Sequence, residues 1–247
     1  MDKKECIVLK DATLGYKKTN ASISILKHLN LTFYSGDFVG VVGVNGVGKS
    51  TLLKSLCGLL PVLEGEIFID EQPISKLLLN ELAKKIAIVL TEKIGGFNLT
   101  AYDAVAAGQM PYTNSFNRLE KENRLIIDQA IKICGITAHQ HKLLNELSDG
   151  LFQKTIIAKA LAQQTPIMLL DEPSAFLDYA SKHDLFILLR KLADEENKCV
   201  LASSHDLDLL LKYCNKLLVI STTSIELISV SEAKTNKVFL EIGGGFI

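Results

Sequence analysis

The chain has 247 residues, 48% of them hydrophobic, and a formal net charge of −1 at pH 7. This length suits one or two domains with a sizeable apolar core. Because a nucleic-acid-binding surface is usually strongly basic, the balanced charge argues against nucleic acid as a partner. No apolar run approaches the roughly 18 uncharged residues of a membrane span, so we expect neither a membrane span nor a secreted protein. The five cysteines are odd in number and form no CxxC pair, which favours reduced thiols over disulfides or a zinc site.

The N-terminal segment predicts a β-hairpin. Residues 7–9 and 23–33 are β-like and frame the turn-rich residues 15–22. Tyr16 lies between them, where an aromatic ring is ordinarily part of the sheet surface or core, although an exposed ring can stack on a base.

Residues 43–51, GVNGVGKST, form the clearest chemical motif of the chain. A β-branched run precedes them and a helix-like run follows, which is the context of a phosphate-binding loop. Glycines let several backbone N–H groups converge on one anion, and the following helix N-terminus adds partial positive charge. We expect Lys49 to reach the β- and γ-phosphates of a nucleotide and the Ser50 hydroxyl to bind Mg²⁺. The nucleotide-binding residues expected in this loop are Gly43, Asn45, Gly46, Gly48, Lys49, Ser50 and Thr51.

Residues 98–164 have a mostly helical pattern. Thr100 is predicted to cap the first helix. Residues 119–134 predict an amphipathic helix, whose apolar stripe includes Leu125 and Ile133.

Strands and helices alternate after this block. The apolar runs 167–170, 199–202 and 217–220 predict buried strands, separated by helices at 179–196 and 206–214. Such alternation predicts a parallel sheet with crossover helices on both faces. The fold class is therefore α/β: a P-loop NTPase core with a mainly parallel sheet, an N-terminal antiparallel β subdomain and a helical insertion. Near the C-terminus, residues 225–230 and 238–242 are strand-like.

The run at 167–170 leads directly into two carboxylates, Asp171 and Glu172. The C-terminal edge of a buried parallel strand borders the ligand crevice of an open α/β sheet. We expect Asp171 to hold Mg²⁺, directly or through a water, and Glu172 to polarise the attacking water as a general base. The alternative is an ordinary strand end followed by a solvated acidic turn.

Two short segments carry further candidate residues. Ser148 precedes a helix-like run, where a serine is usually only an N-cap, yet the same helix end can bind an anion. His205 follows the run 199–202, and a histidine at a strand end in a phosphate crevice can donate to a γ-phosphate. The alternative for His205 is a satisfied surface or core histidine.

Five motifs, taken in their order along the chain, resemble those of the ATP-binding subunit of an ABC transporter. They are GVNGVGKST at 43–51, similar to Walker A; LSDG at 147–150, similar to the signature; IMLLDEP at 167–173, similar to Walker B; SAFLD at 174–178, similar to the D-loop; and SSHD at 203–206, similar to the switch histidine. The resemblance implies a single ABC ATPase domain over residues 1–247. Its catalytic core and β subdomain would span 1–96 and 161–247, and a helical subdomain at 97–160 would carry the signature.

The resemblance also assigns roles to single residues. Asp171 would position the metal, Glu172 would activate water, and His205 and Lys49 would contact the γ-phosphate. Tyr16 stands where the family places an aromatic residue that stacks on adenine. ATP and Mg²⁺ are the implied cofactors.

The implied partners are a second copy of the chain and a membrane permease. In a head-to-tail dimer, Ser148 and Gly150 would contact the ATP of the partner copy. The helical block would dock the transmembrane permease at the cytoplasmic face of the inner membrane, in a system that includes a substrate-binding protein. Residues 98–112 are similar to the subfamily that serves iron-siderophore, haem and cobalamin importers, which implies uptake of a metal chelate. The alternative is a soluble ABC ATPase that acts as an assembly or regulatory module without a permease.

Two further interpretations rest on short stretches of the sequence. Tyr112 after Pro111 is expected to shape an aromatic pocket for a permease helix, together with Phe97 and Phe116, although a locally packed turn explains the same residues. A signalling GTPase is disfavoured because there is no NKxD motif.

The sequence departs from the family pattern at two places. Thr91 and Glu92 stand where a glutamine is usual, so either Glu92 or a shifted register takes over, or the metal keeps one more water. In the signature, Asp149 replaces a glycine and Leu151 replaces a glutamine. A carboxylate beside a γ-phosphate is repulsive unless it points away, for example as a cap of the helix.

Overall fold

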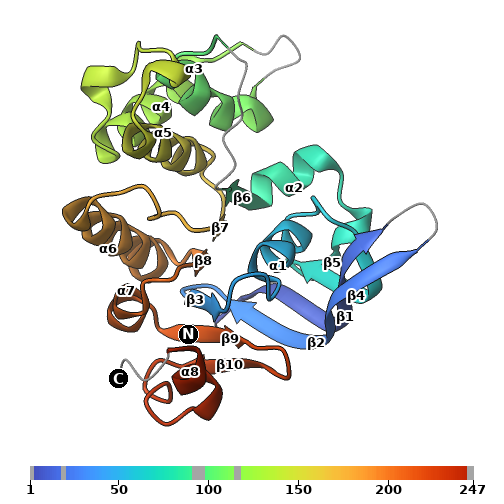
Figure 1. Cartoon of the computed structure of the whole chain (residues 1–247). Coiled ribbons are helices and arrows are strands. Elements are labelled where there is room, and N and C mark those ends of the chain that lie inside the picture. The colour runs from blue at the N-terminus through green and yellow to red at the C-terminus, as the bar shows by residue number, and fades with distance from the viewer. Residues whose placement is uncertain (1–2, 18–20, 91–97, 114–117, 244–247) are drawn as a thin grey trace.

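The computed structural model describes residues 3–17, 21–90, 98–113 and 118–243 (Figure 1). The strands are β1 (Glu5–Lys17), β2 (Ser22–Tyr34), β3 (Phe38–Gly43), β4 (Val62–Ile69), β5 (Gln72–Pro73), β6 (Ile86–Val89), β7 (Ile167–Leu170), β8 (Cys199–Ser203), β9 (Lys216–Ile220) and β10 (Ile225–Ser229). The α-helices are α1 (Lys49–Leu56), α2 (Leu79–Lys85), α3 (Ala101–Ala106), α4 (Lys121–Ile133), α5 (Asp149–Ala162), α6 (Tyr179–Glu196), α7 (Leu207–Tyr213) and α8 (Lys237–Ile242). No helix in these ranges is both long and apolar enough to cross a membrane.

The strands form two sheets, as the sequence predicts. The antiparallel sheet has the order β2-β1-β4-β5, and the larger sheet has the order β10-β9-β3-β8-β7-β6. The larger sheet is parallel except at its edge, where β10 runs antiparallel to β9. The α/β fold class with a mainly parallel sheet and an N-terminal antiparallel sheet is therefore confirmed.

Both faces of the parallel sheet are covered. On β3, Val39 and Val41 face a core shared with α1 and the antiparallel sheet. Phe38 and Val42 point the other way, into a core shared with α5, α6, α7 and α8. Because successive side chains of a strand alternate between the two faces, a strand covered on both faces is apolar throughout. This explains the uninterrupted apolar runs of the central strands.

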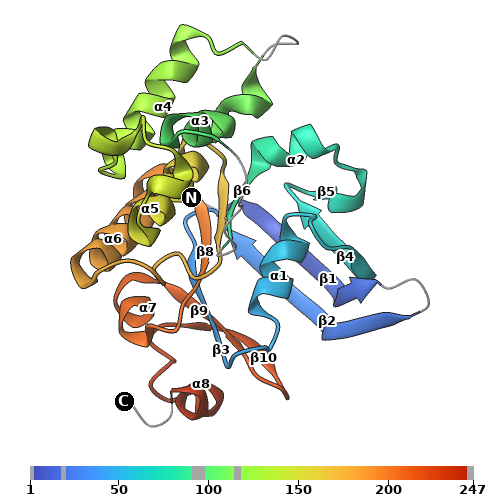
Figure 2. The ribbon, with the colours of Figure 1, turned by 45° about the horizontal axis from the view of Figure 1, so that its top comes forward.

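Helices α3, α4 and α5 pack around a small core of their own, and α5 also lies against the parallel sheet (Figure 2). Thr100 caps α3 as predicted: its hydroxyl oxygen accepts the N–H of Asp103 at 3.1 Å. The apolar stripe of α4 is narrower than the sequence suggests. Its buried residues lie at Ile127, Ala130 and Ile131, whereas Leu125 and Ile133 are 60% and 49% exposed.

The strand-like interpretation of residues 238–242 is wrong, because these residues form helix α8. The side chain of Asn236 caps this helix by accepting the N–H of Phe239 at 2.8 Å. Phe239 is fully buried in the core that covers the parallel sheet. A single aromatic anchor and a cap therefore fix a short helix whose sequence is rich in β-forming residues.

The sheet order brings three loops to one edge. Strands β3, β8 and β7 are neighbours and parallel, so their carboxyl ends lie side by side. Beyond β3 comes the glycine-rich loop, beyond β7 come Asp171 and Glu172, and beyond β8 comes the turn with His205. This edge is the expected position of a ligand in an open α/β sheet.

Candidate functional site

The glycine-rich loop connects β3 to α1 with backbone torsions that favour glycine. Gly46 and Gly48 have φ values of 79° and 117°, both in the left-handed half of conformational space. Helix α1 begins immediately afterwards at Lys49, so its free N–H groups face the loop. The Lys49 ammonium folds back over the loop and donates to the Gly43 carbonyl at 2.7 Å. Backbone donors and a cation thus surround one small volume.

A hollow of about 330 Å³ opens at this edge of the sheet. Its lining residues are Tyr16, Ile25, Asn45, Gly46, Gly48, Lys49, Ser50, Thr51, Asp171, Glu172 and His205. The structure therefore gathers side chains from β1, the loop and two strand ends around one space. Ile25 is an addition from β2 that the sequence motifs do not reveal.

Tyr16 lies at the rim of this hollow. The residue is 41% exposed, and its hydroxyl lies 3.2 Å from the Thr51 hydroxyl on α1. The hydrogen bond fixes the Tyr16 side chain beside the loop.

Asp171 and Glu172 both contact Ser203 of the neighbouring strand β8, and Glu172 also lies close to His205. Ser203, at the end of β8, donates to Asp171 Oδ1 at 2.7 Å and accepts the N–H of Glu172 at 2.9 Å. Glu172 Oε1 lies 3.2 Å from His205 Nε2. The sequence motifs assign no role to Ser203, although the sequence shows it as a polar residue at the end of an apolar strand.

Burial and charge shift the pKa values of the central groups in opposite directions. Burial lowers the pKa of the Lys49 ammonium, while the nearby Glu172 and Asp171 oppose this effect. Burial raises the pKa of the Glu172 carboxyl, and the charges of His205 and Lys49 act against it. A carboxyl whose pKa is raised is a stronger base than a solvated one, which suits a proton acceptor.

The residues present fit a nucleotide phosphate with Mg²⁺. The loop N–H groups, the helix N-terminus and Lys49 offer donors to an anion. Ser50 and Asp171 offer hard oxygen ligands, which Mg²⁺ prefers. The described residues contain no cluster of three or more His, Cys, Asp or Glu side chains able to hold a metal on their own. Phosphate oxygens and waters would therefore complete the coordination shell, as is usual for Mg²⁺.

Ser148 and Gly150 lie at the start of α5 and are not among the described residues that line this hollow. The Ser148 hydroxyl oxygen caps α5 by accepting the N–H of Leu151 at 3.4 Å. A Cβ on Gly150 would lie 3.1 Å from the carbonyl of Phe176, so the helix start abuts the segment after the Walker B-like strand.

The departures in the signature have separate settings. Asp149 is in the first turn of α5, where a negative charge favours the helix dipole. Leu151 packs against the core of the helical block. Thr91 and Glu92 lie outside the described residues.

The family comparison decides the identity. The family model described as ABC transporter matches residues 26–175 of the chain. The chain belongs to the ABC transporter family. It is an ABC ATPase domain, so ATP is its nucleotide.

Individual relatives agree with this assignment. An uncharacterized ABC transporter ATP-binding protein of Methanocaldococcus jannaschii is 38% identical over 201 residues, which cover 81% of this chain and 69% of the relative. The ferric enterobactin transport ATP-binding protein of Escherichia coli is 33% identical over 208 residues, covering 84% of this chain and 75% of the relative. A bacterial ABC transporter cassette solved as a dimer superposes with a TM-score of 0.80 at 29% identity, covering 91% of this chain and 98% of that one. The ABC ATPase is thus similar to the ATP-binding proteins of ABC transporters along most of its length.

Proposed function

We propose that this ABC ATPase hydrolyses Mg²⁺-bound ATP to power uptake of a metal chelate through a separate permease. The observation that carries the catalytic part is the grouping of Lys49, Glu172 and His205 around one hollow at the sheet edge. The transport part is supported by relatives named for siderophore transport and for cobalamin and hydroxamate import.

The residues of the hollow divide the chemistry among them. Lys49 exchanges its loop carbonyls for phosphate oxygens, and Ser50 and Asp171 would hold Mg²⁺. When bound, this ion neutralises the charge that develops on the phosphates. Glu172 accepts a proton from the attacking water. His205, within 3.2 Å of Glu172, donates to the γ-phosphate and keeps the carboxylate directed into the hollow.

The second half of the site comes from another copy of the chain. In a head-to-tail dimer, Ser148 and Gly150 contact the ATP held by the partner copy. Two large side chains next to this region support an interface, because Phe176 is 46% and Tyr179 is 79% exposed. A similar cassette solved as a dimer supports a dimeric assembly.

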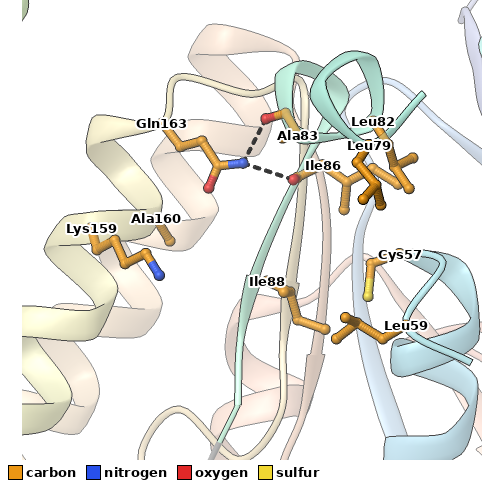
Figure 3. Close-up of a pocket in the computed structure, with 10 residues that line it drawn as sticks. All are labelled: Cys57, Leu59, Leu79, Leu82, Ala83, Ile86, Ile88, Lys159, Ala160 and Gln163. Atoms are coloured by element: carbon orange, nitrogen blue, oxygen red, sulfur yellow. Dashed lines mark hydrogen bonds between the residues drawn. The ribbon is translucent and has the colours of Figure 1, made fainter. Parts of the chain in front are cut away.

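A second hollow, of about 200 Å³, offers a docking site for the permease (Figure 3). It lies between the helical block and the catalytic core: α5 forms one wall, and α2, β6 and the end of α1 form the other. Leu79 on its rim is 85% exposed and Leu59 is 58% exposed. Apolar side chains around a groove suit the apolar face of a short helix, which we assign to a cytoplasmic segment of the permease.

The predicted aromatic pocket is a different feature from this groove. Phe97 and Phe116 lie outside the described residues. The Tyr112 hydroxyl donates to the carbonyl of Gln163 at 2.9 Å, so this tyrosine contributes to local packing between the 107–112 turn and α5.

The catalytic proposal is tested with Glu172→Gln. This variant keeps the shape of the side chain but removes its basicity, so it should bind ATP, stop hydrolysing it and accumulate as a dimer. Phosphate release and size-exclusion chromatography with light scattering measure the two effects. Wild-type turnover in Glu172→Gln would remove Glu172 from the role of base.

The alternative, a soluble assembly or regulatory ATPase, is separated by its partners. Affinity purification from native membranes should retain a protein with several membrane spans, and Leu79→Glu should release it. Leu125→Glu is the matched control, because Leu125 is an exposed leucine of the helical block that lies away from this groove. Stable partnership with soluble proteins alone would favour the alternative.

A further inference from the structure

Ser203 occupies an unusual position at the end of β8. It is fully buried and stands after four apolar residues of the same strand. In the ladder between β7 and β8, Leu170 pairs with Ala202, so the next residues along, Asp171 and Ser203, are opposite each other. Ser203 therefore lies between the two carboxylates that follow β7 and the turn with His205 that follows β8.

The hydroxyl of Ser203 makes two bonds with different roles. It donates its proton to Asp171 Oδ1 at 2.7 Å and accepts the backbone N–H of Glu172 at 2.9 Å. A hydroxyl has one proton to donate and lone pairs to accept with, so both bonds form at once and their directions are set. A bond to an ionised acceptor is about twice as strong as one between neutral groups.

Each bond constrains a group that the proposed reaction uses. The bond to Oδ1 fixes the rotation of the Asp171 carboxylate, which determines where its remaining lone pairs point. The bond from Glu172 N–H holds a residue whose φ is 48°, a left-handed conformation that a non-glycine residue adopts only when its surroundings enforce it. The same hydroxyl thus sets the metal-side carboxylate and the backbone of the general base.

We propose that Ser203 is a positioning residue that orients Asp171 toward Mg²⁺ and holds Glu172 in its catalytic conformation. This inference rests on the proposed roles of Asp171 and Glu172 in the ATPase reaction. Groups that hydrogen-bond to a metal-binding carboxylate tune the affinity for the metal through its orientation and basicity. A hydroxyl that only stabilised the strand end would affect folding without changing the response to Mg²⁺.

The test compares ATP binding with and without the metal in the purified full-length chain. The dissociation constant of ATP is measured once with Mg²⁺ and once with EDTA, and their ratio gives the affinity gained through the metal. In Ser203→Ala, the value in EDTA should stay within about twofold of the wild type, while the gain through Mg²⁺ should fall by about tenfold. The Mg²⁺ concentration for half-maximal hydrolysis should rise by a similar factor.

Two further variants separate positioning from folding. Ser203→Cys places a larger atom with a weaker donor at the same position, so it should lose an intermediate part of the Mg²⁺ effect, and it gives a second measurement if Ser203→Ala does not fold. Thr165→Val is the control: Thr165 is 1% exposed and its hydroxyl bonds the Ile167 carbonyl at 2.8 Å, at the opposite end of β7. It should lower stability but keep the wild-type gain through Mg²⁺.

The outcomes distinguish this inference from the function on which it rests. A wild-type gain through Mg²⁺ that Ser203→Ala and Ser203→Cys both retain would overturn the positioning role alone. An equal loss of ATP affinity in EDTA and in Mg²⁺ would also overturn it, because it would reveal general damage to the hollow. A wild-type protein without any gain through Mg²⁺ would overturn the proposed function together with the inference.

Discussion

Two glycines of the phosphate-binding loop provide a matched pair for mutation. Gly46 and Gly48 both have positive φ, but a Cβ on Gly46 would have nothing within 4 Å. A Cβ on Gly48 would lie 2.8 Å from Ile25 Cγ2 and 3.0 Å from Leu26 Cδ2. Because Cγ2 is attached directly to Cβ, the isoleucine can avoid the contact only by rotating χ1 or shifting β2. Gly46→Ala therefore tests backbone strain alone, and Gly48→Ala tests strain plus a steric clash.

The expected loss of stability follows from these two contributions. A non-glycine residue with positive φ costs about 1–3 kcal/mol, and the cost is toward the upper end at Gly48, whose φ of 117° lies farther from the left-handed helical region than the 79° of Gly46. Overpacking adds about 1–3 kcal/mol for Gly48→Ala alone. A difference of about 2 kcal/mol corresponds to about 4–8 °C in Tm for a chain of this size.

Thermal unfolding measured by circular dichroism checks the difference between the two variants. Nucleotide is left out and EDTA is added, so that contacts with phosphate do not contribute. Gly48→Ala should melt about 4–8 °C below Gly46→Ala. Equal melting temperatures, or a lower value for Gly46→Ala, would refute the reasoning that contact with β2 makes glycine necessary at position 48.

Two further predictions concern buried charges. Asp37 is fully buried, with its carboxylate 2.7 Å from Lys216 Nζ and 3.2 Å from Lys3 Nζ, so Asp37→Asn should lower the free energy of unfolding by about 1.5–3 kcal/mol. Lys3→Ala, at a side chain that is 55% exposed, should cost less than about 1 kcal/mol, and chemical denaturation compares the two; similar losses would contradict the burial argument. Burial raises the pKa of Glu172 in the folded protein, so the folded state binds this proton more tightly than the unfolded state. The free energy of unfolding therefore falls as the pH rises above 4.5. Glu172→Gln should therefore be more stable than the wild type at pH 7.5, with a difference that disappears below pH 4.5; a difference that grows toward low pH would contradict the direction of the shift.

The sequence predicts helix α6 to the residue, and the structure explains why. Tyr179–Glu196 has a cap at each end: the Asp178 carboxylate accepts the N–H of Ser181 at 2.9 Å, and Asn197 adopts φ 54° after the last turn. Both ends of α6 are set by residues close in the chain, so local sequence patterns are sufficient to predict them. The strand prediction for α8 fails because the helix depends on Phe239, which is buried in a core shared with β3, a strand about 200 residues earlier in the chain.

The candidate site shows the same difference between contacts of residues close in sequence and contacts of distant residues. Motifs with fixed spacing, such as the glycine-rich loop before Lys49, identify residues whose partners are close in sequence. The relation of Ser203 to Asp171 depends on which strands are neighbours, and β7 and β8 are separated in the chain by the whole of α6. Chain order alone does not determine lateral pairing in a sheet, so this contact required the structure.

The position of Lys49 affects how ATP affinity should be understood. In the free protein its ammonium already has a partner in the Gly43 carbonyl. Phosphate binding is therefore an exchange of acceptors, and the net gain is the difference between two bonds rather than the strength of one. A Lys49→Ala variant would also leave that carbonyl without its partner, so its affinity would reflect a changed resting loop as well as a lost phosphate contact. Lys49 thus stabilises its own loop in the free protein, and ATP binding must first break this hydrogen bond.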